Sequence, residues 1–230
     1  MKKLLATIFA FLFVFLFCAQ AVTFSSDANI QSGNNWMNVN IYDTPPNHTT
    51  VTMTGGTVND SMGVYNASTL NMSGGNVGGL GVGEFGTVNI SGGSVAGLGL
   101  HDNATATISQ NASIDSAAVM ESSILNMNGG TVASIGGYEN SILNISGGNI
   151  SDMLGAYGNT IINVYGYNLS MTQSGGTHGV GQITGYWLND SQFTINLGGT
   201  DAYTHINLIP EPTSLLLLGV GAFLLRKSHK

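Results

Sequence analysis

The fold is decided by a motif that is clearest at Ser141-Ile142-Leu143-Asn144-Ile145-Ser146-Gly147-Gly148. Similar copies occur at Ser68-Thr69-Leu70-Asn71-Met72-Ser73-Gly74-Gly75 and at Gly86-Thr87-Val88-Asn89-Ile90-Ser91-Gly92-Gly93. When the copies are aligned on the glycine pair, they begin eighteen or nineteen residues apart, at Gly55, Gly74, Gly92, Gln110, Gly129, Gly147 and Gly166. A fixed period of this length predicts a solenoid in which each copy forms one coil.

Apolar and polar residues alternate before each glycine pair. The positions two and four residues before the pair are apolar in every copy, as in Val51 and Met53 or Leu143 and Ile145. Alternation with period two predicts a strand with one buried face, and the glycines allow a sharp corner. We therefore predict an all-β fold, a parallel β-helix of about seven coils with a cap at each end. The chirality rule for parallel crossovers predicts a right-handed coil.

The N-terminal residues 1–21 have the pattern of a secretory signal peptide. Lys2 and Lys3 precede an apolar run from Leu4 to Cys18, and Ala19-Gln20-Ala21 offers a cleavage site of small residues. We expect the mature chain to begin at Val22. The alternative is a lipoprotein attached through Cys18, although the residue before that cysteine is Phe17 rather than a small one.

Composition divides the remaining chain into four segments. Residues 22–47 contain an alternating strand and a proline turn, which predict an N-terminal cap. Residues 48–172 hold the repeats, and the fourth copy, which lacks the glycine pair at Gln110-Asn111, predicts a local bulge. Residues 173–208 lose the period, become rich in aromatic residues and predict a C-terminal cap. Residues 209–230 form a C-terminal tail that does not share the repeat.

The distribution of charge excludes several classes of function. All five Lys and Arg residues lie at the two ends of the chain, whereas twelve carboxylate residues are present and the sequence pI is about 4.8. A nucleic-acid-binding protein needs a basic surface, which the repeats lack. Anionic polysaccharides would be repelled unless divalent cations bridge the two surfaces.

The C-terminal tail has three parts. Pro210-Glu211-Pro212 precedes an apolar stretch from Thr213 to Leu225, and Arg226-Lys227 follows it. This arrangement resembles the PEP-CTERM sorting signal, and the repeats resemble autotransporter-like coils. The resemblance implies that an exosortase in the inner membrane recognises Pro210, Glu211 and Pro212 and cleaves near them, after signal peptidase has removed the leader. The apolar stretch would insert transiently, with Arg226 and Lys227 as the stop on the cytoplasmic side.

Two columns of side chains are candidate binding sites. Glu84, Asp102, Glu121 and Glu139 each stand eight residues before the pair position, so stacking would place their carboxylates about 4.8 Å apart. Such a column suits Ca²⁺, and the alternative is a solvated turn that limits aggregation. Tyr65, Tyr138 and Tyr157 occupy the neighbouring column and are candidates for contact with neutral glycans. The alternative for these tyrosines is that they cover a corner of the coil.

The polar residues between the apolar positions form an outward column. It contains Asn71, Asn89, Asn126, Asn144 and Asn163, with Thr52 and Thr107 in the remaining copies. Side-chain amides at strand spacing can hydrogen-bond to one another along the stack, so this column predicts an amide ladder.

These observations predict a secreted or cell-surface protein with a structural or adhesive role, sorted to the envelope or to the polysaccharide matrix of a biofilm. We expect it not to be an enzyme. One alternative is a module that binds neutral glycans. Another is a β-helical polysaccharide-degrading enzyme that uses paired acids such as Asp102 and Glu121. The histidines share no metal-ligand spacing, and no cofactor other than the candidate Ca²⁺ is indicated.

Overall fold

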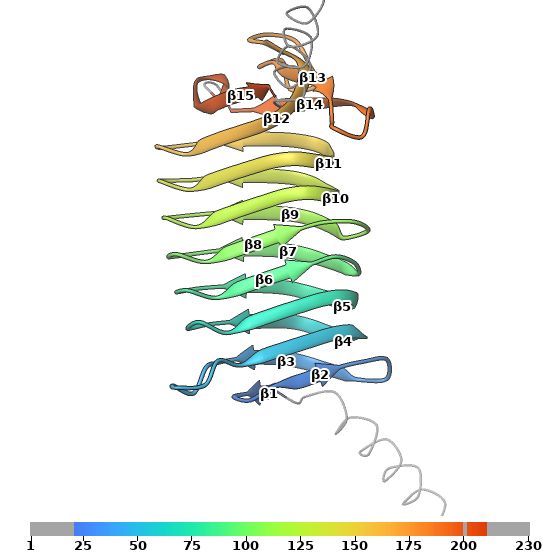
Figure 1. Cartoon of the computed structure of the whole chain (residues 1–230), viewed down its shortest axis with the longest axis vertical. Coiled ribbons are helices and arrows are strands. Elements are labelled where there is room, and N and C mark those ends of the chain that lie inside the picture. The colour runs from blue at the N-terminus through green and yellow to red at the C-terminus, as the bar shows by residue number, and fades with distance from the viewer. Residues whose placement is uncertain (1–20, 200–201, 211–230) are drawn as a thin grey trace, which may run out of the picture.

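The computed structural model describes residues 21–199 and 202–210 of the chain. Over these residues the protein is an all-β solenoid of about eight turns, built from stacked parallel coils. Figure 1 shows the coils following one another along the long axis, with β1 to β3 at one end and β13 to β15 at the other. The predicted parallel β-helix is therefore confirmed.

The elements follow one another without an α-helix among the described residues. The strands and the single 3-10 helix are β1 (Ala21–Phe24), β2 (Ala28–Ile30), β3 (Asn35–Ile41), β4 (Thr50–Val64), β5 (Thr69–Val82), β6 (Thr87–Ile90), β7 (Ser94–Leu100), β8 (Thr105–Ile108), β9 (Ser113–Val119), β10 (Ile124–Gly137), β11 (Ile142–Ala156), β12 (Ile161–Thr172), β13 (Gln182–Tyr186), β14 (Gln192–Gly198), η1 (Ala202–His205) and β15 (Ile206–Pro210).

Equivalent residues of successive coils lie side by side. Val51 pairs with Leu70 and Met53 with Met72, and this register continues through β6, β8, β10, β11 and β12. Both apolar columns predicted from the motif are buried along the stack. Because each strand pairs with the coil above and the coil below, stacking satisfies the backbone and the core together.

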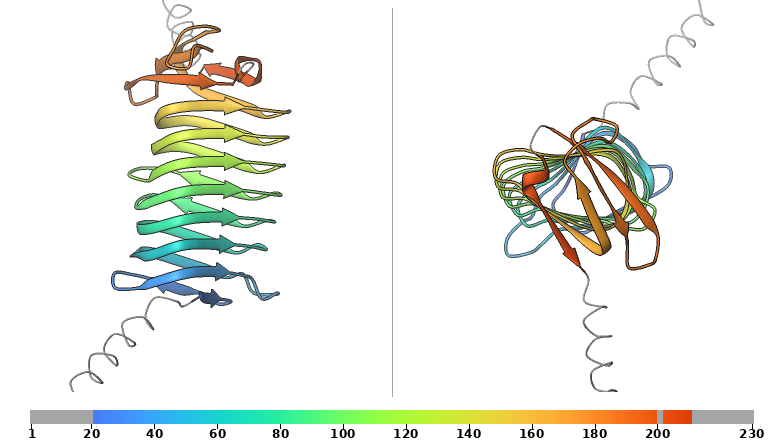
Figure 2. Two further views of the ribbon diagram at one scale, coloured as in Figure 1. Left: turned by 180° about the vertical axis from the view of Figure 1, so that it is seen from behind. Right: turned by 90° about the horizontal axis from the view of Figure 1, so that it is seen from above.

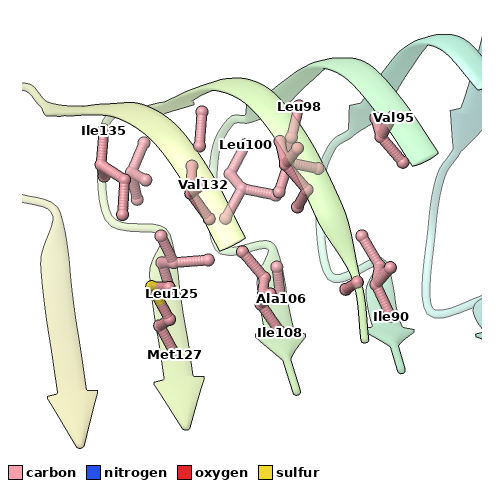
Figure 3. Packing of buried hydrophobic residues seen from close by; sticks show 14 of the residues in the cluster. Ile90, Val95, Leu98, Leu100, Ala106, Ile108, Leu125, Met127, Val132 and Ile135 are labelled. Carbon is pink, nitrogen blue, oxygen red and sulfur yellow. The ribbon is translucent and has the colours of Figure 1, made fainter. Parts of the chain in front are cut away.

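Each coil has a second face, which follows the glycine corner. In β5 this face carries Val77, Leu80 and Val82, which continue as Val95, Leu98 and Leu100 in the next coil. Figure 3 shows that side chains from both faces point into one shared interior. At about 1.5–3 kcal/mol for each buried aliphatic side chain, these columns are the main source of stability.

Glycine is required at the corner for a steric reason as well as a conformational one. Gly75 has a φ of +94°, which side chains disfavour, and a Cβ there would lie 2.5 Å from Cε of Met53 and 2.8 Å from the carbonyl oxygen of Gly55. The corner therefore requires glycine because the coil below fills the space of a side chain.

The solenoid begins earlier than the glycine alignment indicates. β2 pairs with β4, Ala28 opposite Val51, and β3 pairs with the second half of β4, Trp36 opposite Val58. The segment assigned to the cap thus contains a further coil of the stack. Trp36 occupies a core column and packs edge-on against Phe24, with ring centroids 5.9 Å apart. These two aromatic rings cover the first coil.

The irregular fourth coil stays in register with its neighbours. β8 pairs with β6 and with β10, and β9 pairs with β7 and with β10. A short turn takes the place of the glycine corner and is closed by the hydrogen bond from the N–H of Ala112 to the carbonyl oxygen of Ser109 (3.2 Å). The repeat therefore continues without a break.

The parallel order ends in a hairpin. β12 pairs antiparallel with β13, which pairs antiparallel with β14, and β14 also lies parallel to β11. β15 then pairs with β12, Ile162 opposite Ile206. Seen along the axis, these last elements lie across the end of the coils (Figure 2).

Candidate functional surfaces

The acidic residues occupy one repeating turn. Glu84, Asp102, Glu121 and Glu139 are exposed, and all four have a φ between 57° and 60°. The column extends at both ends to Asn66 (φ 58°) and Gly158 (φ 71°). Asn and Gly are the residues that tolerate this left-handed region best, so the position is defined by its backbone conformation.

The carboxylates contact the backbone of the preceding coil. The N–H of Asn66 donates to Oε2 of Glu84 (2.8 Å), and the N–H of Glu84 donates to Oδ2 of Asp102 (2.9 Å). The N–H of Asp102 in turn donates to Oε2 of Glu121. Three of the predicted site residues are therefore brought together, and each satisfies an outward-facing amide.

This geometry gives the column a role that needs no cation. The described residues contain no group of three or more His, Cys, Asp or Glu side chains arranged to hold a metal ion. Each turn supplies one carboxylate, whereas Ca²⁺ takes six to eight oxygen ligands. Calcium binding by this column stays a prediction from the sequence.

The three predicted tyrosines fall into two separate stacks. Tyr65 stacks on Tyr42 with ring centroids 5.0 Å apart, and Tyr138 stacks on Tyr157 at 5.1 Å. Between the stacks the column holds Gly83, His101 and Met120. The tyrosines therefore do not form one continuous surface.

A shallow groove of about 390 Å³ runs beside the second stack. Its floor consists of small residues of successive coils, among them Gly97, Gly99, Ala118 and Gly136, and Tyr138 and Tyr157 stand at its edge. The Tyr138 ring lies over Gly136, where a Cβ would come within 2.9 Å of it. Flat aromatic rings beside a floor of small residues can accept a sugar ring, so neutral-glycan contact here stays a prediction.

The predicted amide ladder is present in two runs. The side chain of Asn89 donates to Asn71 (2.9 Å). Beyond Thr107 the second run begins, in which Asn144 donates to Asn126, Asn163 to Asn144 and Asn207 to Asn163, over 2.9–3.1 Å. Asn207 could not be predicted from the repeat, because β15 joins the stack from outside it.

The predicted sorting motif begins at the last residue that the structure describes. Pro210 is the last residue of β15 and lies opposite Gly166. Glu211, Pro212, Arg226 and Lys227, with the apolar stretch between them, lie outside the described residues. No helix within residues 21–199 and 202–210 is long and apolar enough to cross a membrane.

Comparisons with known proteins found no relatives. No family model, no curated protein and no solved structure matches the chain.

Proposed function

We propose that the protein is a structural and adhesive component of the cell surface or of the extracellular polysaccharide matrix. The observation that carries this proposal is the uninterrupted stack of about eight coils around one aliphatic core. At about 4.8 Å for each coil, the stack forms a rod of roughly 38 Å. Its stability requires no disulfide, since the only cysteine, Cys18, precedes the described residues.

The two ends of the fold are compatible with the proposed processing. Val22 lies in β1 opposite Val39, and Pro210 ends β15. Removal of a signal peptide after Ala21 would take only the first residue of β1, and cleavage of the tail beyond Pro210 would leave β15 paired with β12. An exosortase-type system is thus the proposed route, with transient membrane insertion of the tail.

The location is tested by antibody labelling of cells that produce the full chain, before and after permeabilisation. We expect intact cells or their matrix to be labelled, and replacement of Pro210, Glu211 and Pro212 by alanine to reduce the surface signal at least several-fold. Asn207→Ala, an exposed change in the same strand, is the control and keeps the signal. Labelling that appears only after permeabilisation would contradict the proposal.

Neutral-glycan binding is a second candidate function, favoured by the stacked pair Tyr138 and Tyr157 beside the groove. Ring faces supply apolar area, and the hydroxyl groups supply hydrogen bonds. Loss of glycan retention in a Tyr138→Ala, Tyr157→Ala double variant, with retention in Tyr65→Ala, would support it. Equal retention by both variants would exclude this surface.

We propose no catalytic role. Asp102 and Glu121, the paired acids of the enzymatic alternative, both accept backbone N–H groups in the turn column. If the protein were a hydrolase that used these two acids, the variants Asp102→Asn and Glu121→Gln would each lose the turnover of polysaccharides.

A further inference from the structure

An open cleft of about 820 Å³ lies between the coils and the C-terminal hairpin. One side is formed by the glycine corners of neighbouring coils, Gly129-Gly130 and Gly147-Gly148. The other side is the turn that joins β13 to β14, from Trp187 to Ser191, with the start of β14. The cleft lies at the glycine corner, and none of its lining residues lines the groove of the tyrosine stack.

The hairpin side of the cleft is held in place. The indole N–H of Trp187 donates to the carbonyl oxygen of Gly148 (3.1 Å), and the Trp187 ring stacks on Phe193 with centroids 3.7 Å apart. The N–H of Asp190 donates to the carbonyl oxygen of Trp187 (3.0 Å), and the hydroxyl of Tyr167 donates to Oδ1 of Asp190 (2.6 Å). A cleft with fixed walls loses little entropy when a ligand binds.

The lining is polar but uncharged. It contains no acidic, basic or histidine side chain, and five of its residues carry side-chain amides: Gln110, Asn128, Asn149, Asn189 and Gln192. Among the described residues, the amides of Gln110, Asn128, Asn149 and Gln192 have no hydrogen-bond partner. The ladder asparagines, by contrast, use their amides on one another. Free donors and acceptors thus converge in the cleft.

Gln110 reaches the cleft because the fourth coil departs from the repeat. It has a φ of 50° at the position where the other coils have the glycine pair, and its backbone nitrogen would lie 2.6 Å from a Cβ at Gly129. The irregular coil therefore adds a side chain to a corner that is bare glycine in the coils stacked next to it.

We propose that this cleft binds a neutral oligosaccharide. An uncharged lining lacks the opposite charge that favours an ionic ligand, whereas side-chain amides can donate to and accept from sugar hydroxyls. Leu188, which is 55% exposed, supplies apolar area for the faces of sugar rings. The volume falls within the usual range for ligand sites, about 300–1,000 Å³. This site goes beyond the proposed structural role and does not depend on the surface location.

Trp187 provides the readout. The chain contains two tryptophans, Trp36 and Trp187. In the full chain carrying Trp36→Phe, we would titrate neutral hexasaccharides of glucose, mannose, galactose and N-acetylglucosamine and follow the fluorescence of Trp187. We expect at least one of them to give a saturable change, and a hexasaccharide of galacturonate to give none.

Cleft variants test whether the amides make the contacts. Asn149→Ala and Gln110→Ala should each weaken binding by about 3- to 10-fold. Asn76→Ala is the matched control, because Asn76 occupies the same column as Asn149 several coils away and should leave the affinity unchanged. No response to any neutral hexasaccharide would overturn the proposal. Tighter binding of the galacturonate hexasaccharide than of the neutral ones would also overturn it. The same holds if binding is lost in the Tyr138→Ala, Tyr157→Ala variant and not in the cleft variants.

Discussion

At the scale of single residues, the repeating turn that contains Glu84, Asp102, Glu121 and Glu139 places two requirements on one position: a left-handed backbone and an acceptor for an exposed N–H. The backbone is left-handed, which costs a residue with a Cβ about 1 kcal/mol, and the N–H at that position points outward. Glu84, Asp102 and Glu121 offset this cost by accepting the N–H of the preceding coil. Glu139 has the same φ but its carboxylate accepts no hydrogen bond from another described residue.

Glu121→Ala is therefore expected to destabilise the protein by about 0.5–1 kcal/mol, because the N–H of Asp102 loses its charged acceptor at an exposed site. Glu139→Ala removes the same side chain at the same φ without removing such a bond, so its cost should be smaller. Urea unfolding of both variants measures the difference. Equal costs would show that the hydrogen bond contributes nothing.

The surroundings of Asp43 shift the pKa of its carboxyl group. Burial by itself would raise the pKa of Asp43, but the hydrogen bonds from the N–H of Thr49 (2.7 Å) and from His48 (2.8 Å) outweigh burial and lower the pKa below its ordinary value of 3.8. The Asp43 side chain is only 4% exposed, whereas that of its partner His48 is 75% exposed. The two hydrogen bonds hold the turn from Thr44 to Asn47 against the first coil.

This shift predicts a defined pH dependence. Because the folded pKa is lower than the unfolded one, the stabilisation is complete above the unfolded pKa and is lost as the pH falls through the folded pKa. At pH 7, Asp43→Asn should cost about 1.5–3 kcal/mol, and the gap between parent and variant should shrink as the pH falls below 3.8. Asp115→Asn, at a residue that makes no side-chain bond within the described chain, is the control in urea unfolding across pH. A gap that stays constant down to pH 2 would contradict this account.

At the scale of elements, the Asn ladder was predictable because its spacing is the repeat itself. The same pattern also predicts where the ladder is interrupted, at Thr107 between Asn89 and Asn126. An amide at that position would have a partner in the coil below and another in the coil above.

Thr107→Asn is expected to join the two runs and stabilise the protein by about 0.5–1 kcal/mol, after the lower strand preference of Asn is subtracted. Thr105→Asn is the matched control, since Thr105 lies in the same strand and faces outward beside Thr87 and Ile124, which carry no amide. The thermal midpoints of the two variants compare them directly. If Thr107→Asn is no more stable than Thr105→Asn, the ladder is not cooperative.

Other elements were not predictable from the motif. The sequence of the first coil does not match the repeat because residues 31–34 stand where later coils have the glycine pair, although the core residues Ile30 and Val39 keep their register. The direction of β13 and β14 depends on contacts between distant residues, such as Trp187 with Gly148. Patterns within one coil carry no information about contacts between distant residues. The cleft between the coils and the hairpin depends on such contacts, so it could not be predicted either.

At the scale of the whole molecule, the periodicity accounts for the core from Val51 to Val164, whereas the buried residues of β2, β3 and the C-terminal elements lie outside the repeat. The predictions for the surfaces had different outcomes, because a column of like residues predicts which side chains lie close together but not what they bind. Glu84, Asp102 and Glu121 lie close together and accept backbone N–H groups, whereas Tyr65 is separated from Tyr138 and Tyr157 by coils without tyrosine. The proposed role of the tail rests on a sequence resemblance.

The central claim is that processing at both ends delivers an intact solenoid to the cell surface. The most direct measurement is the intact mass of the protein purified from its native cells and medium. We predict a species that begins at Val22 and ends between Pro210 and Pro212, which keeps β15 paired with β12. A species that retains Lys230 would contradict the account of the tail and indicate a protein that stays tethered to the membrane.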